Sequence, residues 1–280
     1  MASSLDGQHA FVTGGGSGIG LAAARALLRD GATVTLGGRS LGKLEVACAE
    51  LGAGAHPEVC DVGDEEALGA VLDRANERLP LTVVVASAGT GGAGPLLDMQ
   101  LGQWQDIMRT NLTGAFLTIK SAGRHLVDNG GGSICAVSSI AGSHTHRFMS
   151  AYAASKAGLN MLVRNAADEL GSLGVRVNAV APGIVETEIS AALQGDAGVL
   201  ADYRRNMPLG RMGAPDEVAD AIRFLCGPES AWITGVVLPV DGGHHLRRGP
   251  TIDTLLDPHV DDLPVPSRGL ERDLRTGGHE

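Results

Sequence analysis

The sequence predicts an α/β fold: a doubly wound parallel sheet in a single domain, followed by a C-terminal extension. Short apolar runs typical of buried strands alternate with stretches of helical periodicity. A glycine cluster joins the first such strand to the first helix. Glycine accounts for 41 of 280 residues and aromatic residues for only 3%. This balance favours small aliphatic side chains packed between helices and a sheet.

The predicted strands and helices alternate along the whole chain. Strands are predicted at residues 10–12, 33–36, 59–60, 82–86, 133–137, 175–180 and 235–240. Helices are predicted at residues 19–29, 41–51, 64–78, 101–127, 149–170 and 215–225. Crossovers between parallel strands are right-handed, so these helices are expected on both faces of the sheet.

Composition and charge limit the domain organisation and the partners. The domain is predicted to span residues 1–248, and residues 249–280, with four of the twelve prolines, predict an extension outside the core sheet. The net charge of -10 argues against a nucleic-acid or anionic-membrane partner. No signal-sequence pattern opens the chain and no apolar run approaches about 18 residues, so we expect a cytoplasmic protein. The four cysteines lie far apart and predict buried free thiols without a metal site.

The glycine cluster is the first candidate binding site. It reads Thr13-Gly14-Gly15-Gly16-Ser17-Gly18-Ile19-Gly20. Glycines in a strand-to-helix turn let backbone N–H groups approach a pyrophosphate, whose charge the helix N-terminus favours. A glycine loop alone is weak evidence, but its place after the first strand predicts dinucleotide binding. The candidate cofactor-binding residues here are Thr13, Gly14, Ser17, Gly18, Ile19 and Gly20.

The end of the second strand distinguishes NAD(H) from NADP(H). An acid there would bind the ribose hydroxyls of the adenosine, but the chain reads Gly38-Arg39-Ser40. The Arg39 guanidinium, assisted by Ser40, suits a 2′-phosphate; alternatively, Arg39 pairs with a nearby acid. We therefore expect NADP(H), with NAD(H) as the alternative. Asp61 and Val62, after the third strand, are expected to hold the adenine edge, unless Asp61 merely caps the next helix.

Tyr152 and Lys156 form the candidate catalytic pair. Their i,i+4 spacing puts both on one face of the predicted helix. A free phenol has a pKa of about 10, and an ammonium about 4 Å away would lower that pKa by about 3 units. Tyr152 would then protonate an oxyanion in a reduction or deprotonate an alcohol in an oxidation. The alternative is a surface tyrosine that happens to lie near a surface lysine.

Two polar residues in other segments fit the same chemistry. Ser139 lies 13 residues before Tyr152, just after a predicted strand, where its hydroxyl can hold a substrate oxygen; an ordinary turn contact is the alternative. Asn111 interrupts an otherwise helical run. Its amide can hold a water that relays protons through Lys156, and an incidental helix kink is the alternative.

Together these residues resemble the short-chain dehydrogenase/reductase family, over Leu5 to Gly243. The TGxxxGIG turn, the Asn, the Ser–Tyr spacing and YxxxK match in order, as do Pro182 to Thr187 and the final Asp241-Gly242-Gly243. The resemblance implies a Rossmann fold and an NAD(P)-dependent oxidoreductase with catalytic Asn111, Ser139, Tyr152 and Lys156. It implies further cofactor contacts from Ser87, Ala88, Gly89, Tyr152, Lys156, Pro182, Gly183, Val185 and Thr187. Ser87 departs from the family's Asn-Asn-Ala-Gly, which puts stability in more doubt than chemistry.

The substrate is expected to be a small-molecule carbonyl compound or alcohol. A 3-oxoacyl-thioester (acyl carrier protein) reductase is the alternative, and it would need a basic patch for its carrier, for which Arg147, Arg204, Arg205 and Arg211 are the candidates. A non-catalytic redox sensor would not need the proton-transfer set. Residues 186–212 resemble the family's substrate lid. The resemblance also implies a homo-oligomer, a tetramer or dimer, formed through the helices at 101–127 and 149–170.

Histidines in two segments remain without an assigned role. His144 and His146 lie between Ser139 and Tyr152, where they either line the substrate pocket or sit in an exposed polar loop. His244 and His245 follow the last predicted strand and are expected at a subunit contact or in solvent.

Overall fold

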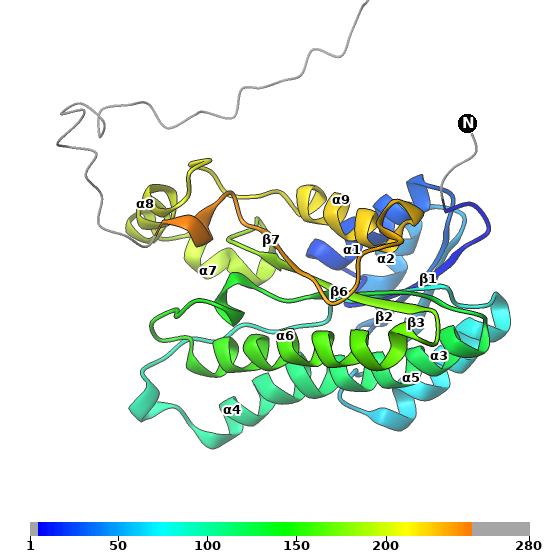
Figure 1. Ribbon diagram of the computed structural model, residues 1–280. Coiled ribbons are helices and arrows are strands. Elements are labelled where there is room, and N and C mark those ends of the chain that lie inside the picture. The colour runs from blue at the N-terminus through cyan, green and yellow to red at the C-terminus, as the bar shows by residue number, and fades with distance from the viewer. Residues whose placement is uncertain (1–4, 248–280) are drawn as a thin grey trace, which may run out of the picture.

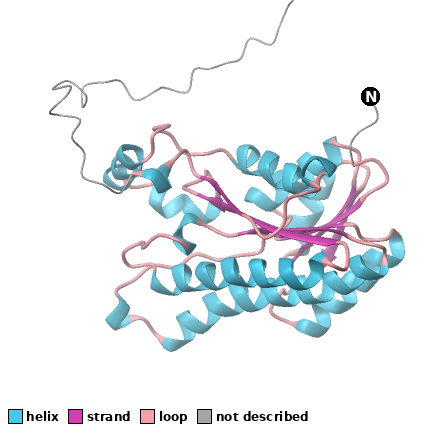
Figure 2. Cartoon of the chain, in the orientation of Figure 1, coloured by secondary structure: helices cyan, strands magenta, loops and turns pink. Residues whose placement is uncertain are grey.

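A parallel sheet forms the middle layer of the molecule (Figures 1 and 2). The computed structural model describes residues 5–247, and within them the sheet has seven strands in the order β3-β2-β1-β4-β5-β6-β7. Their bounds are β1 His9–Thr13, β2 Thr33–Gly38, β3 Ala55–Val59, β4 Val83–Ala86, β5 Gly132–Val137, β6 Val175–Pro182 and β7 Val237–Val240. The order reverses between β1 and β4, and in such sheets ligands bind at the carboxyl ends of the strands beside this reversal. The predicted fold class is confirmed.

Helices cover both faces of the sheet (Figure 1). One apolar core lies under α1 Gly18–Arg29, α2 Leu41–Leu51 and α9 Pro215–Cys226. A second lies under α3 Glu65–Arg78, α5 Gly114–Asp128 and α6 Ser150–Gly171. The strands between these cores are apolar on both faces, as in β4, where every residue is buried. No helix within residues 5–247 is both long and apolar enough to cross a membrane.

The third strand lies earlier in the chain than predicted. The sequence indicates residues 59–60, whereas β3 spans Ala55–Val59. β3 is an edge strand that pairs only with β2. An edge strand tolerates polar residues and a proline, so His56, Pro57 and Glu58 hide the strand from an apolar pattern.

The predicted helix at 101–127 contains an irregular turn. It divides into α4 Leu101–Met108, a π-helical turn at Arg109–Thr113 and α5. A π-turn inserts an extra residue without ending the helix, and such turns occur frequently at functional sites. Asn111 lies in the middle of it.

Short elements follow β5, β6 and β7. A 3-10 turn, η3 (Ile140–Gly142), comes directly after β5. The predicted lid contains η4 Glu188–Ser190, α7 Ala191–Gln194 and α8 Ala197–Asn206. Another 3-10 turn, η6 (His244–Leu246), follows β7. The predicted extension, residues 249–280, lies outside the described residues.

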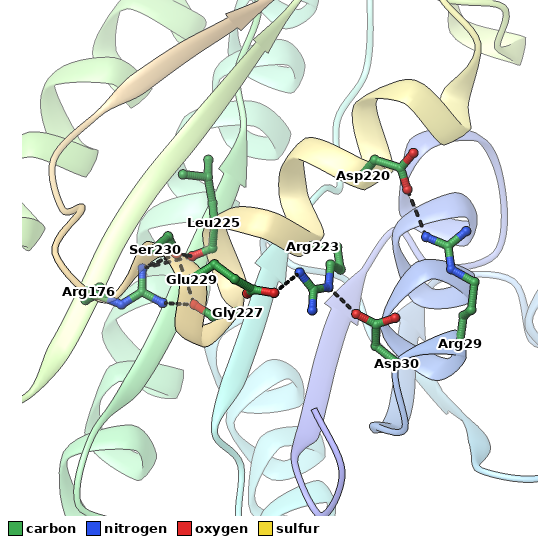
Figure 3. A network of polar contacts seen from close by, with 9 residues as sticks. All are labelled: Arg29, Asp30, Arg176, Asp220, Arg223, Leu225, Gly227, Glu229 and Ser230. Carbon is green, nitrogen blue, oxygen red and sulfur yellow. Dashed lines mark hydrogen bonds and ion pairs between the residues drawn. The ribbon is translucent and has the colours of Figure 1, made fainter. Parts of the chain in front are cut away.

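Polar contacts hold the C-terminal half of α9 in place (Figure 3). Arg223 contacts Asp30 at the end of α1 and Glu229 after α9, with 2.7 Å from Nη1 to the Glu229 carboxylate. On β6, Arg176 donates hydrogen bonds to the carbonyls of Leu225 and Gly227 at 2.9 and 3.1 Å. A positive group at a helix C-terminus satisfies carbonyls that have no partner within the helix.

Candidate active site

The turn after β1 packs tightly against the chain that leaves β4. Gly14 has a φ of +66°, and a Cβ there would lie 3.0 Å from the Cα of Ala88, so only glycine fits. The buried Thr13 hydroxyl accepts hydrogen bonds from the backbone N–H groups of Ser87 and Ala88, both at 3.0 Å. Thr13, predicted to bind the cofactor, therefore joins the two strand ends that border the candidate site.

The N-terminus of α1 is open to an anion. Its N-cap, Ser17, makes no side-chain capping bond, and its first turn contains no acidic residue. A cavity of about 450 Å³ lies here, lined by Ser17, Gly18 and Thr187 among others. Thr187 reaches the turn itself, because a Cβ on Gly18 would be 3.4 Å from its Cγ2. Backbone N–H groups, a free hydroxyl and this space fit the pyrophosphate of a dinucleotide.

The end of β2 presents positive charge. Arg39 is exposed, and no ion pair joins it to an acid within residues 5–247. The Ser40 hydroxyl is the N-cap acceptor of α2, at 3.4 Å from the N of Lys43. Lys43 in turn pairs with Glu188 of the lid, at 2.8 Å. These groups fit a 2′-phosphate, since Arg39 retains its donors.

Asp61 does not cap α3. The N-cap of α3 is Asp64, which accepts from the N of Ala67 at 3.0 Å. Asp61 accepts from the N of Gly63 at 2.9 Å and pairs with Arg109 at 3.0 Å. The Gly63 hydrogen bond and Arg109, with Arg39 nearby, hold the pKa of Asp61 below its usual value. Asp61 thus stays ionised beside the end of β3, where Val62 is buried.

The segment after β6 carries the residues matched to nicotinamide binding. The Gly183 N–H donates to the Val240 carbonyl at 3.2 Å, which ties the end of β6 to β7. Val185 is buried and forms a bridge to Gly213. Thr187 donates its N–H to Ser190 Oγ at 3.2 Å. This segment therefore has a fixed backbone next to the glycine turn.

Tyr152 lies in the first turn of α6 and faces Ser139 after β5. The Ser139 hydroxyl accepts from the N of Ala141 at 3.1 Å and hydrogen-bonds to the Tyr152 phenol. Burial raises the pKa of Tyr152, and the Ser139 hydrogen bond offsets this only in part. At neutral pH the phenol is therefore protonated in the protein alone.

Lys156 lies beside the Tyr152 ring, but it does not have the predicted effect on the pKa of the phenol. Its Nζ is 5.7 Å from the centre of the Tyr152 ring and donates to the Val137 carbonyl at 2.8 Å. Burial lowers the pKa of Lys156 to about 8. The expected lowering of the phenol's pKa by this ammonium is wrong for the protein alone, because burial of the phenol dominates.

Asn111 is held by a closed set of hydrogen bonds. Its Oδ1 accepts from the N of Thr90 at 2.8 Å, and its Nδ2 donates to the Thr90 carbonyl at 3.0 Å and to Ser155 Oγ at 3.1 Å. Gly89 lies between Asn111 and Lys156, since a Cβ there would be 3.4 Å from Asn111 Oδ1 and 3.7 Å from Lys156 Nζ. The π-turn therefore delivers Asn111 to the Lys156 side of the site. Sequence reasoning missed Thr90 and Ser155.

Two of the histidines without an assigned role, His146 and His244, meet against Tyr203 of the lid helix. The His244 ring contacts Tyr203 of α8 and His146, with ring centres 5.5 and 6.3 Å apart. His244 is half-buried within one protomer, and its expected place at a subunit contact or in solvent stays a prediction. Within residues 5–247 no group of three His, Cys, Asp or Glu side chains could hold a metal ion.

Comparison with known proteins identifies the family. A family model described as enoyl-(acyl carrier protein) reductase matches residues 14–245. The galactitol 2-dehydrogenase (L-tagatose-forming) of Cereibacter sphaeroides is 38% identical over 86% of this chain and 96% of its own. The chain belongs to the short-chain dehydrogenase/reductase family. It is accordingly an oxidoreductase of the alcohol–carbonyl type.

Other short-chain dehydrogenases show the range of substrates in similar chains. The 3-oxoacyl-[acyl-carrier-protein] reductase of Vibrio harveyi is 37% identical over 86% of this chain and 99% of its own. A gluconate 5-dehydrogenase from Burkholderia cenocepacia J2315, solved in complex with NADP and tartrate, superposes with a TM-score of 0.85. It is 31% identical, and the match covers 88% of this chain and 99% of that one.

Proposed function

We propose that the protein interconverts a secondary alcohol and a ketone with NADP(H), using Tyr152 as the proton-transfer residue. One observation carries this proposal: Ser139, Tyr152, Lys156 and Asn111 come from three segments and converge beside the glycine turn. Proton transfer at the substrate oxygen needs a positioned acid or base within hydrogen-bond reach. A dinucleotide-binding protein without turnover would not need this arrangement.

The chain's own residues divide the proton chemistry among them. The nicotinamide group, when bound, supplies or accepts the hydride. During reduction the Tyr152 phenol gives its proton to the substrate oxygen while the carbonyl carbon gains hydride; oxidation reverses both transfers. The Ser139 hydroxyl holds the same oxygen. Lys156 places positive charge beside the Tyr152 ring, which stabilises the phenolate that remains after proton transfer.

The cofactor preference is assigned to Arg39. Arg39 and Ser40 follow β2 where an acid would favour NAD(H). Arg39 lies near Asp61, but no ion pair joins it to an acid within residues 5–247. The NADP of the Burkholderia structure supports the proposal by analogy. The Arg39→Asp variant should lose most of its NADPH efficiency and gain NADH efficiency. A native enzyme that prefers NADH would overturn the assignment.

A second candidate is a 3-oxoacyl-thioester reductase, favoured by the Vibrio relative. Two of the four arginines of the predicted basic patch contact neighbouring residues of the chain. Arg211 pairs with Glu217 at 2.6 Å, and Arg147 lies over the Phe148 ring at 4.6 Å. Arg204 and Arg205 remain on the lid helix α8.

One substrate panel tests both candidates. NADPH oxidation and NADP⁺ reduction are measured with ketones, secondary alcohols and 3-oxoacyl thioesters. The Tyr152→Phe variant keeps the ring and removes the phenol, so its turnover should fall by about 10²-fold or more. Full activity of this variant would contradict the mechanism. A preference for carrier-bound thioesters would select the second candidate.

We further propose a cytoplasmic homo-oligomer. Phe116 on α5 and Met161 on α6 are 45% and 54% exposed, and exposed apolar groups on adjacent helices support self-association. Light scattering after size-exclusion chromatography should give a dimer or tetramer mass, and a monomer mass would reject the proposal.

A further inference from the structure

Three rings from separate segments meet against the lid helix α8. His146 comes from the loop after η3, Tyr203 from α8 and His244 from η6. In Figure 1, α8 lies next to the orange turn that contains η6. Burial raises the pKa of Tyr203, and the charge of an ionised Tyr152 raises it further, so the two phenols lie within electrostatic range of each other. We call His146, Tyr203 and His244 the ring cluster.

The ring cluster is held together by edge contacts rather than by polar bonds. The rings of Tyr203 and His244 meet at an interplanar angle of 82°, and the rings of His146 and His244 meet at 66°. His146 Nδ1 hydrogen-bonds to the His144 carbonyl at 3.0 Å. By contrast, the Nδ1 atoms of His144 and His244 are buried without a hydrogen-bond partner among the described residues.

Unpaired polar atoms next to a reaction centre call for a ligand. An unpaired buried polar group costs about 1–3 kcal/mol, and native proteins rarely keep one without a reason. No described residue of the chain supplies the partner of His244. A substrate group held beside Tyr152 would lie near this cluster when the lid closes over it.

The charges around the ring cluster indicate which chemical group of a substrate it would bind. Burial lowers the pKa of both His146 and His244, so both rings are neutral at neutral pH. Asp202 precedes Tyr203, and Asp241 lies near His244, where it pairs with His245 at 2.8 Å. The two carboxylates would disfavour a substrate carboxylate, and the neutral imidazoles carry no positive charge to offset them. A neutral hydroxyl can donate to and accept from imidazole and phenol.

We propose that His244, with His146 and Tyr203, binds a second hydroxyl group of the substrate. The enzyme would then act on neutral polyhydroxy alcohols and the matching hydroxyketones in preference to simple alcohols and hydroxy acids. This inference rests on the proposed alcohol–ketone reaction at Tyr152. A site built to hydrogen-bond a hydroxyl discriminates strongly against an analogue that lacks it.

Matched alcohols and matched variants test the inference. The alcohols are cyclohexanol, 1,2- and 1,4-cyclohexanediol, 4-hydroxycyclohexanecarboxylate and galactitol, oxidised with NADP⁺ and with NAD⁺. His244→Phe keeps a ring against Tyr203 and removes both nitrogens, whereas Tyr203→Phe removes only the hydroxyl. His125→Phe is the control, since His125 lies on α5 and pairs with Asp73.

The wild-type enzyme should favour a diol or galactitol in kcat/KM over both cyclohexanol and the carboxylate. His244→Phe should lower kcat/KM for that polyol by about 3- to 10-fold, mainly through KM, and change cyclohexanol less than about twofold. His125→Phe should leave both values unchanged. Equal losses on polyol and cyclohexanol, or a wild-type preference for cyclohexanol or the carboxylate, would overturn the inference.

A binding measurement separates this inference from the reaction itself. Thermal stabilisation by each alcohol is measured with the Tyr152→Phe enzyme in the presence of NADP⁺. The polyol should stabilise this variant more than cyclohexanol does, and the additional His244→Phe change should abolish the difference. If this holds while the wild type turns over none of the alcohols, the proposed reaction fails and the hydroxyl site stands. If the polyol stabilises this variant no more than cyclohexanol does, the hydroxyl site is rejected.

Discussion

Lys156 combines a buried position with a functional charge. Its side chain is fully enclosed between α6 and the end of β5, where its Nζ finds one backbone carbonyl, that of Val137. No carboxylate offsets the burial, which is why its pKa falls to about 8. Active sites often retain such groups at the expense of stability. The position of Lys156 beside Tyr152 therefore has a measurable thermodynamic consequence.

Replacing Lys156 by Met should stabilise the protein at neutral pH. In the unfolded chain a lysine keeps its proton up to about pH 10.4, but in the folded protein Lys156 releases it above about pH 8. Between these values the unfolded state binds more protons, so native stability rises with pH. The depressed pKa means that burying the charged Lys156 destabilises the folded wild type by about 3 kcal/mol below pH 8. The net gain expected for Lys156→Met is about 2 kcal/mol, because the substitution leaves the Val137 carbonyl unpaired.

Urea unfolding at pH 7 and pH 10 measures this effect. The Lys156→Met protein should be more stable than the wild type by about 2 kcal/mol at pH 7, and this advantage should fall by a similar amount at pH 10. All other titratable groups are present in both proteins, so their effects on stability cancel in the comparison. An advantage that is independent of pH would show that the pKa of Lys156 is not lowered in the folded protein.

Asn111 should contribute to stability as well as to the site. Asn111→Leu would leave the N–H and carbonyl of Thr90 without their partner and would remove one of the two hydrogen bonds of the Ser155 hydroxyl. We expect a loss of about 2–4 kcal/mol in the free energy of unfolding and a loss of activity. Asn165→Leu, at an exposed position of the same fold, should change neither by much. A small stability loss at Asn111 would mean that water replaces these bonds.

Site candidates that belong to a local sequence pattern were the ones that could be predicted. Tyr152 and Lys156 are four positions apart on one helix, and Ser139 lies shortly before them. Thr90 and Ser155 could not be found, because their role depends on where the π-turn places the Asn111 side chain. Tyr203 and His244 meet only through the packing of α8 against the segment after β7, which no local pattern reports.

Elements inside the sheet were predicted better than those at its edges. The central strands β4, β5 and β6 are apolar on both faces and stand out in the sequence. β3 does not, since its edge position admits Pro57 and partly exposed polar residues. The 101–127 run showed its irregularity only through Asn111. An extra residue in a π-turn leaves the helical periodicity on either side intact.

The packing of α9 on α1 depends on one partly buried arginine. Arg223 is 17% exposed in its side chain and contacts both Asp30 and Glu229. Arg223→Met should lower the free energy of unfolding by about 1–3 kcal/mol, because it leaves the Asp30 carboxylate without this cation. Arg29→Met is the matched control: Arg29 joins the same helices through Asp220, but both side chains are 64% exposed.

Chemical denaturation compares these two variants directly. Arg29→Met should change stability by less than about 0.5 kcal/mol, since an exposed ion pair contributes little. Equal effects of the two substitutions would show that burial does not distinguish the two pairs.

At the scale of the whole molecule, the site depends on how two halves of the sheet meet. β1 and β4 are neighbours at the reversal of strand order, and their carboxyl ends carry the glycine turn and the segment from Ser87 to Gly89. The glycine turn would hold the cofactor, and Gly89 lies beside Asn111 and Lys156, since a Cβ on Gly89 would be within 4 Å of both side chains. Anything that separates these two ends should weaken cofactor binding without touching a catalytic side chain.

Thr13 is the group that joins them. Its hydroxyl accepts from the N–H groups of Ser87 and Ala88 and donates to the Val85 carbonyl. Thr13→Val keeps the shape and leaves two N–H groups unpaired, so we expect about 1–3 kcal/mol less stability. The loosened segment should also weaken NADP⁺ binding.

Thr118→Val is the control for this substitution. Thr118 is equally buried, but its hydroxyl donates to the Gly114 carbonyl within α5, so its loss leaves no N–H unpaired. Titration calorimetry with NADP⁺ should show a larger dissociation constant, and hence weaker binding, for Thr13→Val and an unchanged constant for Thr118→Val. If Thr13→Val lost stability but kept its cofactor affinity, the two strand ends would be coupled by packing alone. The tight approach of Gly14 to Ala88 would then suffice to hold the turn in place.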